Sequence, residues 1–274
     1  MLFAIGDVHG HAEHLDALLD VLRPEIARAR ARGRAGELVM LGDYVDRGPD
    51  SVGVLRRLIG LNRALGIPVH LLRGNHDHYL IEFLLAEWPQ PGALEAWCGN
   101  GGLTTLAELG IRRTEAMNRH PADLAARARD RAGPEIVGLL RRIELSRASG
   151  GYVFAHAGVS RSLPLAEHGH REFLCLREPF LSGKHWRHPF TVVHGHTIRG
   201  PEVLPHRIAV DSGTYRTGVL TALQIDGGHL RFLCVTSEPK CKSFKRLPGL
   251  KQGRRFSAPR EVEPVRELAL AVGA

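Results

Sequence analysis

Short apolar runs alternate with polar clusters along the chain. Five runs rich in β-branched or aromatic residues each end in a cluster of Gly, His or Asp: residues 2–5, 38–41, 69–72, 152–155 and 191–193. Runs of this length and composition predict strands that are buried on both faces of a sheet. Apolar residues at helical spacing lie between the first three runs, in residues 11–22, with a possible extension to residue 32, and in residues 51–65. This alternation of strand and helix predicts a parallel or mixed α/β core.

Three further apolar runs follow in the last part of the chain. Residues 207–210, 219–225 and 230–235 are separated by Gly-rich turns, and this pattern predicts a meander that completes a second sheet. The expected fold class is therefore α/β, with a two-sheet mixed β-sandwich flanked by helices.

The composition changes between residues 79 and 149. Ala- and Arg-rich runs punctuated by prolines predict a helical insert over the site, within a single domain of residues 1–237. After that point the hydrophobic pattern fades into Lys, Arg, Pro and Gly. Residues 238–274 are therefore expected to form a basic, flexible C-terminal tail.

The charge of the chain is concentrated in that tail. The net charge of the 274 residues is +8, and residues 239–260 alone carry eight Lys and Arg with no acidic residue. The rest of the chain is neutral overall, which argues against a basic nucleic-acid-binding surface and against nucleic acid as a partner. The tail is expected to be a solvated extension, with contact to a polyanion as the alternative.

Membrane and secretory functions are not indicated. The longest apolar runs are too short to cross a bilayer, and no signal-peptide pattern stands at the N-terminus, so we expect a cytoplasmic protein without a membrane partner. The four cysteines are scattered without zinc-like spacing, which predicts reduced thiols.

The polar clusters at the strand ends carry the candidate chemistry: GDVHG at 6–10, GDYVDRG at 42–48, GNHD at 74–77, HAG at 156–158 and GHT at 195–197. Ligands of α/β sheets collect beyond the carboxyl ends of the strands, so these loops are expected to converge. Asp, His and Asn without thiolate suit Mn²⁺, Fe or Zn²⁺. One carboxylate can bridge two such ions about 3.5–4 Å apart, as in enzymes of phosphate chemistry.

In order and spacing, these motifs resemble those of the phosphoprotein phosphatase branch of the calcineurin-like metallophosphoesterases. The resemblance implies two divalent ions as cofactors, with Mn²⁺ favoured and Fe or Zn²⁺ as alternatives. It implies that Asp7 and His9 are ligands of the first metal and that Asp43 bridges both. It assigns three ligands to the second metal, namely Asn75, His156 and His196. A hydroxide between the metals would then attack phosphorus directly.

The same resemblance implies a phosphate clamp and a proton donor. Three arginines correspond to the clamp, namely Arg47, Arg73 and Arg177. Arg177 lies in LCLREPF, which is similar to the WIRxPF segment of bacterial members except that Cys175 replaces the Trp. One guanidinium group can donate two parallel hydrogen bonds to two oxygens of a phosphate, which favours Arg at such sites. His76, held by Asp46, would protonate the leaving alkoxide.

The sequence leaves three alternative functions. The first is a bacterial-type serine/threonine phosphatase or broad phosphomonoesterase, acting on phosphorylated proteins or small phosphoesters. The alternative is a symmetrical dinucleoside (diadenosine) tetraphosphate hydrolase, although that subfamily typically has Gln in place of His9 and lacks Asp46. The third is a catalytically silent binding module, which the intact set of motif residues opposes. The physiological substrate, the native metal pair and the oligomeric state stay open.

Overall fold

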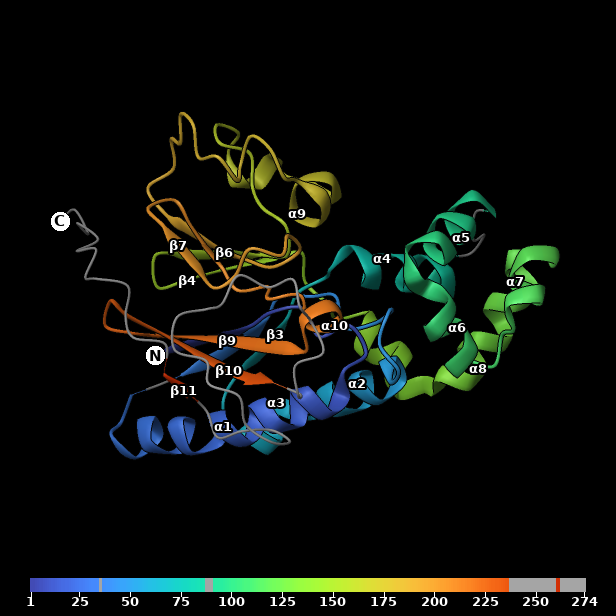
Figure 1. Cartoon of the computed structure of the whole chain (residues 1–274), viewed down its shortest axis with the longest axis horizontal. Helices are drawn as coiled ribbons and strands as arrows, with labels where there is room; N and C mark the ends of the chain where they lie inside the picture. The colour runs from blue at the N-terminus through green and yellow to red at the C-terminus, as the bar shows by residue number, and fades with distance from the viewer. Residues whose placement is uncertain (35, 87–90, 237–259, 262–274) are drawn as a thin grey trace.

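The computed structural model describes residues 1–34, 36–86, 91–236 and 260–261 (Figure 1). Two mixed sheets lie one above the other. The first has the order β11-β10-β9-β1-β2-β3, with β1 (Leu2–Ile5), β2 (Glu37–Met40), β3 (Val69–Leu71), β9 (Val219–Asp226), β10 (His229–Thr236) and β11 (Arg260–Glu261). The second has the order β4-β5-β6-β8-β7, with β4 (Ser146–Ser149), β5 (Tyr152–Ala155), β6 (Thr191–His194), β7 (Glu202–Leu204) and β8 (Arg207–Ala209).

Helices cover the outer faces of both sheets and extend to one side. The first sheet is covered by α1 (Ala12–Ala31), α2 (Ser51–Leu58) and α3 (Leu61–Leu65), and the second by α9 (His170–Cys175) (Figure 1). A helical arm projects from the sheets and consists of α4 (Asn75–Leu85), α5 (Pro91–Trp97), the π-helical turn η1 (Cys98–Gly102), α6 (Leu103–Glu108), α7 (Arg113–Asn118) and α8 (Pro121–Leu140). The short η2 (Leu165–Glu167) and α10 (Thr214–Thr217) complete the elements.

Three apolar clusters hold these layers together. The largest joins the first sheet to α1, α2 and the helical arm. A second fills the space between the two sheets, where Val39, Phe154 and Val193 are fully buried. A third lies between the second sheet and the α9 region, with Phe180 at its centre. Because both faces of the sheets are covered at their centres, β1, β5 and β6 are almost wholly buried, which is why their sequences show apolar runs and not alternation.

The predicted fold class is confirmed, with one error in sheet assignment. The last two runs do not complete the second sheet, because β9 pairs antiparallel with β1 and β10 pairs with β9, so both belong to the first sheet. Only β8 joins the second sheet, next to β6. The segment between β8 and β9 crosses from one sheet to the other, and local sequence patterns do not record such a crossing.

Two element boundaries also differ from the prediction. Ser146–Ser149, placed in the helical insert, forms β4 and pairs with β5 through a tight turn at Gly150 and Gly151, which have φ of 58° and 82°. Such a Gly-Gly turn suits an antiparallel hairpin. The predicted helix over residues 51–65 is broken at Gly60, which has φ of 73°.

Of the predicted tail, 260–261 form β11, and the remainder, including most of 239–260, lies outside the described residues. Within the described part, no helix has the length and apolar character needed to cross a membrane.

Candidate active site

Most predicted site residues lie in loops at the carboxyl ends of β1, β2, β3, β5 and β6, while Asn75 and His76 begin α4 and Arg177 follows α9. The backbone of these loops is unusual, because positive φ angles are uncommon outside glycine. Six non-glycine residues in the described part of the chain have positive φ, and five of the six are predicted site residues: His9, Asp43, Asp46, Arg47 and His196. Such conformations persist where the surrounding fold fixes them, and they cluster at functional sites.

Two glycines let these loops approach buried carboxylates closely. A Cβ added at Gly74 would overlap the Oδ1 atom of Asp43, and a Cβ added at Gly195 would overlap the Oδ1 atom of Asp7. The glycines of the GNHD and GHT motifs are therefore required by the backbone packing against the carboxylates.

Asp77 fixes the loop that carries Asp43. Its side chain is fully buried and accepts hydrogen bonds from the backbone N–H groups of Asp43 at 2.7 Å, Tyr44 at 2.9 Å and Gly74 at 2.9 Å. Asp77, the third residue of α4, therefore stabilises both this loop and the start of the helix. Burial, followed by the charge of Asp43, raises the pKa of Asp77 to about 7.

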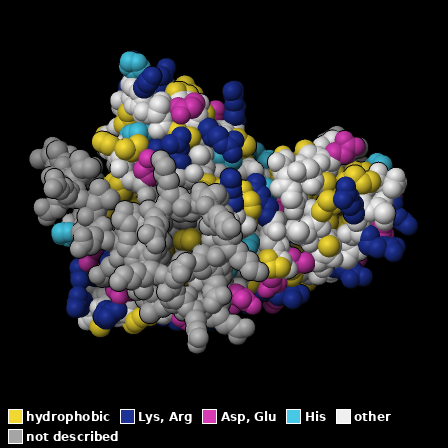
Figure 2. Space-filling view, in the orientation of Figure 1, with side chains coloured by type: hydrophobic (Ala, Val, Ile, Leu, Met, Phe, Trp, Pro, Cys, Tyr) yellow, Lys and Arg dark blue, Asp and Glu magenta, His cyan; other side chains and the backbone are white. Residues whose placement is uncertain are grey.

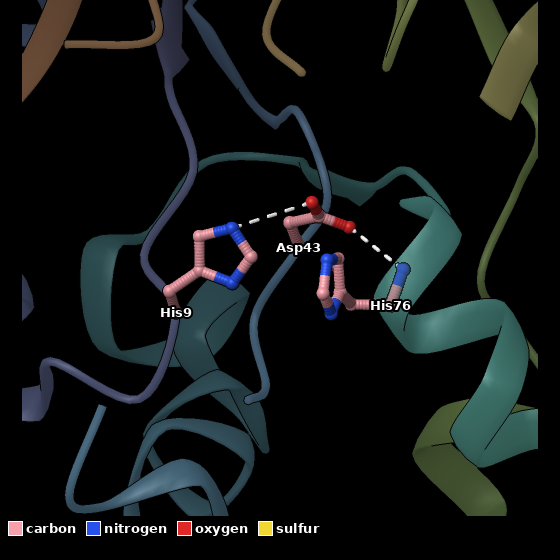
Figure 3. Close-up of side chains that lie close together, drawn as sticks. All are labelled: His9, Asp43 and His76. Atoms are coloured by element: carbon pink, nitrogen blue, oxygen red, sulfur yellow. Dashed lines mark hydrogen bonds and ion pairs between the residues drawn. The ribbon is translucent and has the colours of Figure 1, made fainter. Parts of the chain in front are cut away.

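Asp43 lies at the centre of the site (Figure 3). Its Oδ2 atom is 3.4 Å from His9 Nε2 on one side and 3.5 Å from His156 Nε2 on the other. The Oδ1 atom accepts a hydrogen bond of 2.9 Å from the backbone N–H of His76. This contact fixes the rotation of the carboxylate and leaves Oδ2 facing both histidines, which is the arrangement expected of a bridging ligand.

Nitrogen and oxygen atoms of His156, Asn75 and His196 converge on one side of the site. His156 Nδ1 donates to the carbonyl of Leu41 at 2.9 Å, and burial lowers the pKa of His156, so its Nε2 is an acceptor. That nitrogen faces Asn75 Oδ1 at 3.1 Å, and His196 Nδ1 lies 2.9 Å from the same oxygen. Acceptor atoms of nitrogen and oxygen that converge on each other fit a bound divalent cation.

Among the described residues, two groups of His and Asp could hold a metal ion, and within each group the ligand atoms lie within 4.8 Å of one another: His9, Asp43 and His76, and Asp43, His156 and His196. Asp43 belongs to both groups. Asp7 belongs to neither, and its carboxylate accepts from the backbone N–H of His196 at 3.0 Å. Burial, then the nearby carboxylates of Asp211 and Asp43, raise the pKa of Asp7 well above its usual range. Bound cations would offset this crowding of carboxylates.

His76 also forms a pair with Asp46, as predicted for a proton donor. Its Nδ1 atom donates to Asp46 Oδ2 at 2.7 Å, and the two side chains are almost completely buried. Burial alone would lower the pKa of His76, but Asp43 and the bond to Asp46 outweigh it and raise the pKa. The carboxylate also fixes the ring so that Nε2 is directed toward the site.

Two further side chains donate to the carboxylate of Asp46, and neither was among the predicted site residues. Trp97 Nε1 donates to Asp46 Oδ2 at 2.7 Å, and Thr105 Oγ1 donates to Asp46 Oδ1 at 2.6 Å. Trp97 opens the segment WCGNGG, whose glycines favour a turn. Nothing in the sequence distinguishes Thr105 from the neighbouring Thr104.

The three predicted arginines differ in how they relate to the site. Arg47 donates through Nη1 to His9 Nε2 at 3.0 Å, and its Nη2 atom lies 2.9 Å from His76 Nε2. The ring of Tyr215 covers its guanidinium at 4.3 Å, within the range of a cation–π contact. Arg47 is exposed, so it stands at the opening of the site with its charge directed between the two histidines.

Arg73 and Arg177 make looser contacts. Arg73 is partly buried, and its Nε atom has no hydrogen-bond partner among the described residues, which leaves a donor for an anion. Arg177 is exposed after α9. Burial is the main cause that lowers the pKa of His156, and the charge of Arg177 contributes to the same shift. Burial, then the charge of His156, lowers the pKa of His196 to about 2, and Arg177 contributes there too. Arg177 therefore lies within electrostatic reach of the second group.

His194 does not join the ligands. It is fully buried, its Nδ1 atom bonds the carbonyl of Gly195 at 3.0 Å, and its Nε2 atom faces Arg207 at 3.4 Å. Burial lowers the pKa of His194 to about 3, so the ring is neutral. These contacts support its interpretation as a structural histidine beside the GHT motif.

The two-sheet fold and the shared carboxylate define a metallophosphoesterase. Residues 2–213 match the calcineurin-like phosphoesterase family, and the chain belongs to that family. The predicted family is thereby confirmed.

Known relatives include nucleotide hydrolases. The chain is 26% identical to the asymmetrical bis(5′-nucleosyl)-tetraphosphatase of Halalkalibacterium halodurans, and the match covers 89% of this chain and 98% of the relative. It is 40% identical to the symmetrical bis(5′-nucleosyl)-tetraphosphatase of Erwinia tasmaniensis over 79 residues, which cover 29% of this chain. That match spans only 25% of the length of the relative.

Solved structures agree with the fold. A putative diadenosine tetraphosphatase superposes with a TM-score of 0.54 at 23% identity, covering 85% of this chain and 92% of the other. A mutant cold-active protein tyrosine phosphatase gives 0.50 at 20% identity, covering 86% and 77%. At such identities the similarity concerns the fold alone.

Proposed function

We propose that the chain is a dinuclear metal-dependent phosphomonoesterase, acting on phosphoserine or phosphothreonine in proteins or on small phosphoesters. Asp7 and His9 would hold the first ion, Asp43 would bridge, and the second ion would be held by Asn75, His156 and His196. When bound, Mn²⁺, or Fe or Zn²⁺ in its place, would supply an activated water and neutralise charge on the phosphoryl group. The guanidinium groups would orient that group, with Arg47 nearest the histidines.

One observation carries this choice of substrate, namely the buried pair of His76 and Asp46, joined by a hydrogen bond of 2.7 Å. When the P–O bond breaks, its electrons stay on the leaving oxygen, which takes the proton from His76 Nε2. A serine or threonine alkoxide is a poor leaving group and needs that proton. A nucleotide phosphate is a better leaving group and needs it less. A buried, oriented acid therefore favours alkyl phosphomonoesters.

A comparison of substrates tests the proposal. With one Mn²⁺-loaded preparation, we expect a higher kcat/KM on phosphoserine or phosphothreonine peptides than on diadenosine tetraphosphate. A preference of tenfold or more for the dinucleotide, about 1.4 kcal/mol in transition-state binding, would overturn the assignment.

The second candidate is hydrolysis of dinucleoside tetraphosphates. It is favoured by the relative from Halalkalibacterium halodurans, which matches this chain along nearly its own entire length. The exposed ring of Tyr215, 37% accessible and stacked over Arg47, offers an aromatic surface at the opening of the site on which a base could stack. Separation of the nucleotide products formed from diadenosine tetraphosphate would identify this activity directly.

A further inference from the structure

Asp46 is a fully buried carboxylate whose contacts come from two parts of the chain. His76 is one donor to it, and the other two side-chain donors, Trp97 and Thr105, belong to the helical arm. A buried carboxylate is costly to leave without donors, so each of these bonds contributes to its orientation.

The two arm residues hold the carboxylate from separate positions. Trp97 ends α5 and contacts Oδ2, whereas Thr105 lies in α6 and contacts Oδ1. Both side chains are buried, with accessible fractions of 1% and 0%. A Cβ at Gly102 would overlap the indole ring of Trp97, so the glycine of η1 leaves room for the ring in this position. Rotation of the carboxylate about its Cβ–Cγ bond would therefore break a hydrogen bond at each oxygen.

The α6 helix is itself fixed relative to the loop that carries Asp46. The carboxylate of Glu108 accepts hydrogen bonds of 2.8 Å from the backbone N–H groups of Ser51 and Val52, at the start of α2. Thr105 Oγ1 also accepts from the backbone N–H of Asp46 at 3.0 Å and lies 3.0 Å from Ser51 Oγ. Thus α6 contacts both ends of residues 46–52, and any displacement of the arm would move Asp46.

We propose that Trp97 and Thr105 are positioning residues that act through Asp46, so that the helical arm governs how well His76 protonates the leaving group. This inference rests on the proposed function, because it requires His76 to be the proton donor. With both oxygens of Asp46 fixed, its Oδ2 atom receives the Nδ1–H of His76 and aims Nε2 at the site. Without one of the arm donors, the carboxylate turns and the imidazole loses its alignment with the leaving oxygen.

The alternative is that both residues serve only the packing of the arm. Substitutions that conserve volume separate the two roles. Thr105→Val removes the hydroxyl, whereas Thr105→Ser retains it. Trp97→Phe removes the indole N–H. Thr104→Val is the matched control, because the Thr104 hydroxyl donates to the carbonyl of Gly101 at 3.1 Å.

The experiment measures kcat and KM for each variant on two substrates with different leaving groups, a phosphoserine peptide and p-nitrophenyl phosphate. We expect Thr105→Val and Trp97→Phe to lower kcat on the phosphopeptide by about tenfold, the usual scale for loss of a supporting hydrogen bond. On p-nitrophenyl phosphate, whose leaving group hardly needs a proton, the loss should stay within about threefold. KM should change little, and Thr105→Ser and Thr104→Val should resemble the parent.

His76→Asn, measured beside them, separates the two ways to fail. If His76→Asn lowers kcat equally on both substrates, the proposed function itself is wrong. If His76→Asn lowers kcat more on the phosphopeptide than on p-nitrophenyl phosphate, but Thr105→Val and Trp97→Phe lower kcat equally on both, only the positioning role is wrong. In the second case Thr105→Val would also show a lowered Tm, and Thr105→Ser would restore Tm and both activities together.

Discussion

The loops that carry the candidate metal ligands and the helical arm meet at Asp46, yet different forces fix their geometry. The loops are held by their own backbone, with positive φ at His9, Asp43 and His196 and glycines packed against the carboxylates. The arm is held by side-chain hydrogen bonds over long stretches of sequence, since Thr105 is 59 residues from Asp46. Local backbone requirements leave motifs in a sequence, whereas a distant hydroxyl leaves none. The two regions should therefore also respond differently to substitution.

The largest effect is expected at the centre of the loops. Asp43→Asn weakens the oxygen that faces both His9 and His156, so both ions should bind less well. The loss of kcat should exceed the roughly 10²–10⁴-fold typical of a lost proton donor. Elemental analysis of the purified protein checks the cause, with His9→Asn as the one-metal control. Two retained equivalents with near-normal turnover would exclude the bridging role.

A smaller effect is expected where the loops meet the arm. His76→Asn should lower kcat on a phosphoserine peptide by about 10²–10⁴-fold while the metal content stays near that of the parent. This outcome would separate the proton donor from the metal ligands, although His76 lies within reach of His9 and Asp43. Loss of one metal equivalent in His76→Asn would instead assign the residue to the metal site.

Asp46→Asn should act in the same direction and more mildly, by about 10–10²-fold, because it orients the donor and does not carry the proton. The amide also faces the donors Trp97 and Thr105 with one oxygen in place of two. Kinetics on the phosphopeptide, with metal content measured in parallel, check this order. A loss at Asp46→Asn greater than at His76→Asn would contradict it.

The smallest effect is expected from the C-terminal residues, which contain none of the predicted site residues. Deletion of residues 239–274 should leave p-nitrophenyl phosphatase activity within a few-fold of the parent, since every predicted site residue precedes the deletion. Any effect should appear on polyanionic substrates and weaken with salt, because exposed charges are screened within about 10 Å at 0.1 M. Loss of folding on truncation, seen as loss of the cooperative thermal transition, would show that these residues are structural.

The fold class and the residues of the loops could be predicted because short-range rules govern them. Buried strands need apolar runs, and loops that carry ligands at their ends need glycines such as Gly74 and Gly195. The sheet to which β9 and β10 belong could not be predicted, since their apolar runs suit either sheet. It depends on pairing between β9 and β1, which lie more than 200 residues apart.

The support of the proton donor could not be predicted for a related reason. Trp97 and Thr105 reach Asp46 only because α5 and α6 fold back over the loop after β2, and Glu108 fixes that arrangement through two backbone bonds. β4 was missed for a simpler reason. Its sequence SRAS lacks the apolar character of a strand, although Gly150 and Gly151 mark the hairpin that follows.

The central claim is that His76 donates a proton to the leaving oxygen. It is tested most directly by the dependence of kcat on leaving-group pKa across a series of substituted phenyl phosphates, measured for the parent and for His76→Asn. We expect a shallow dependence for the parent and a steep one for His76→Asn, since the variant must expel an unprotonated phenolate. Equal slopes for the two proteins would contradict the claim.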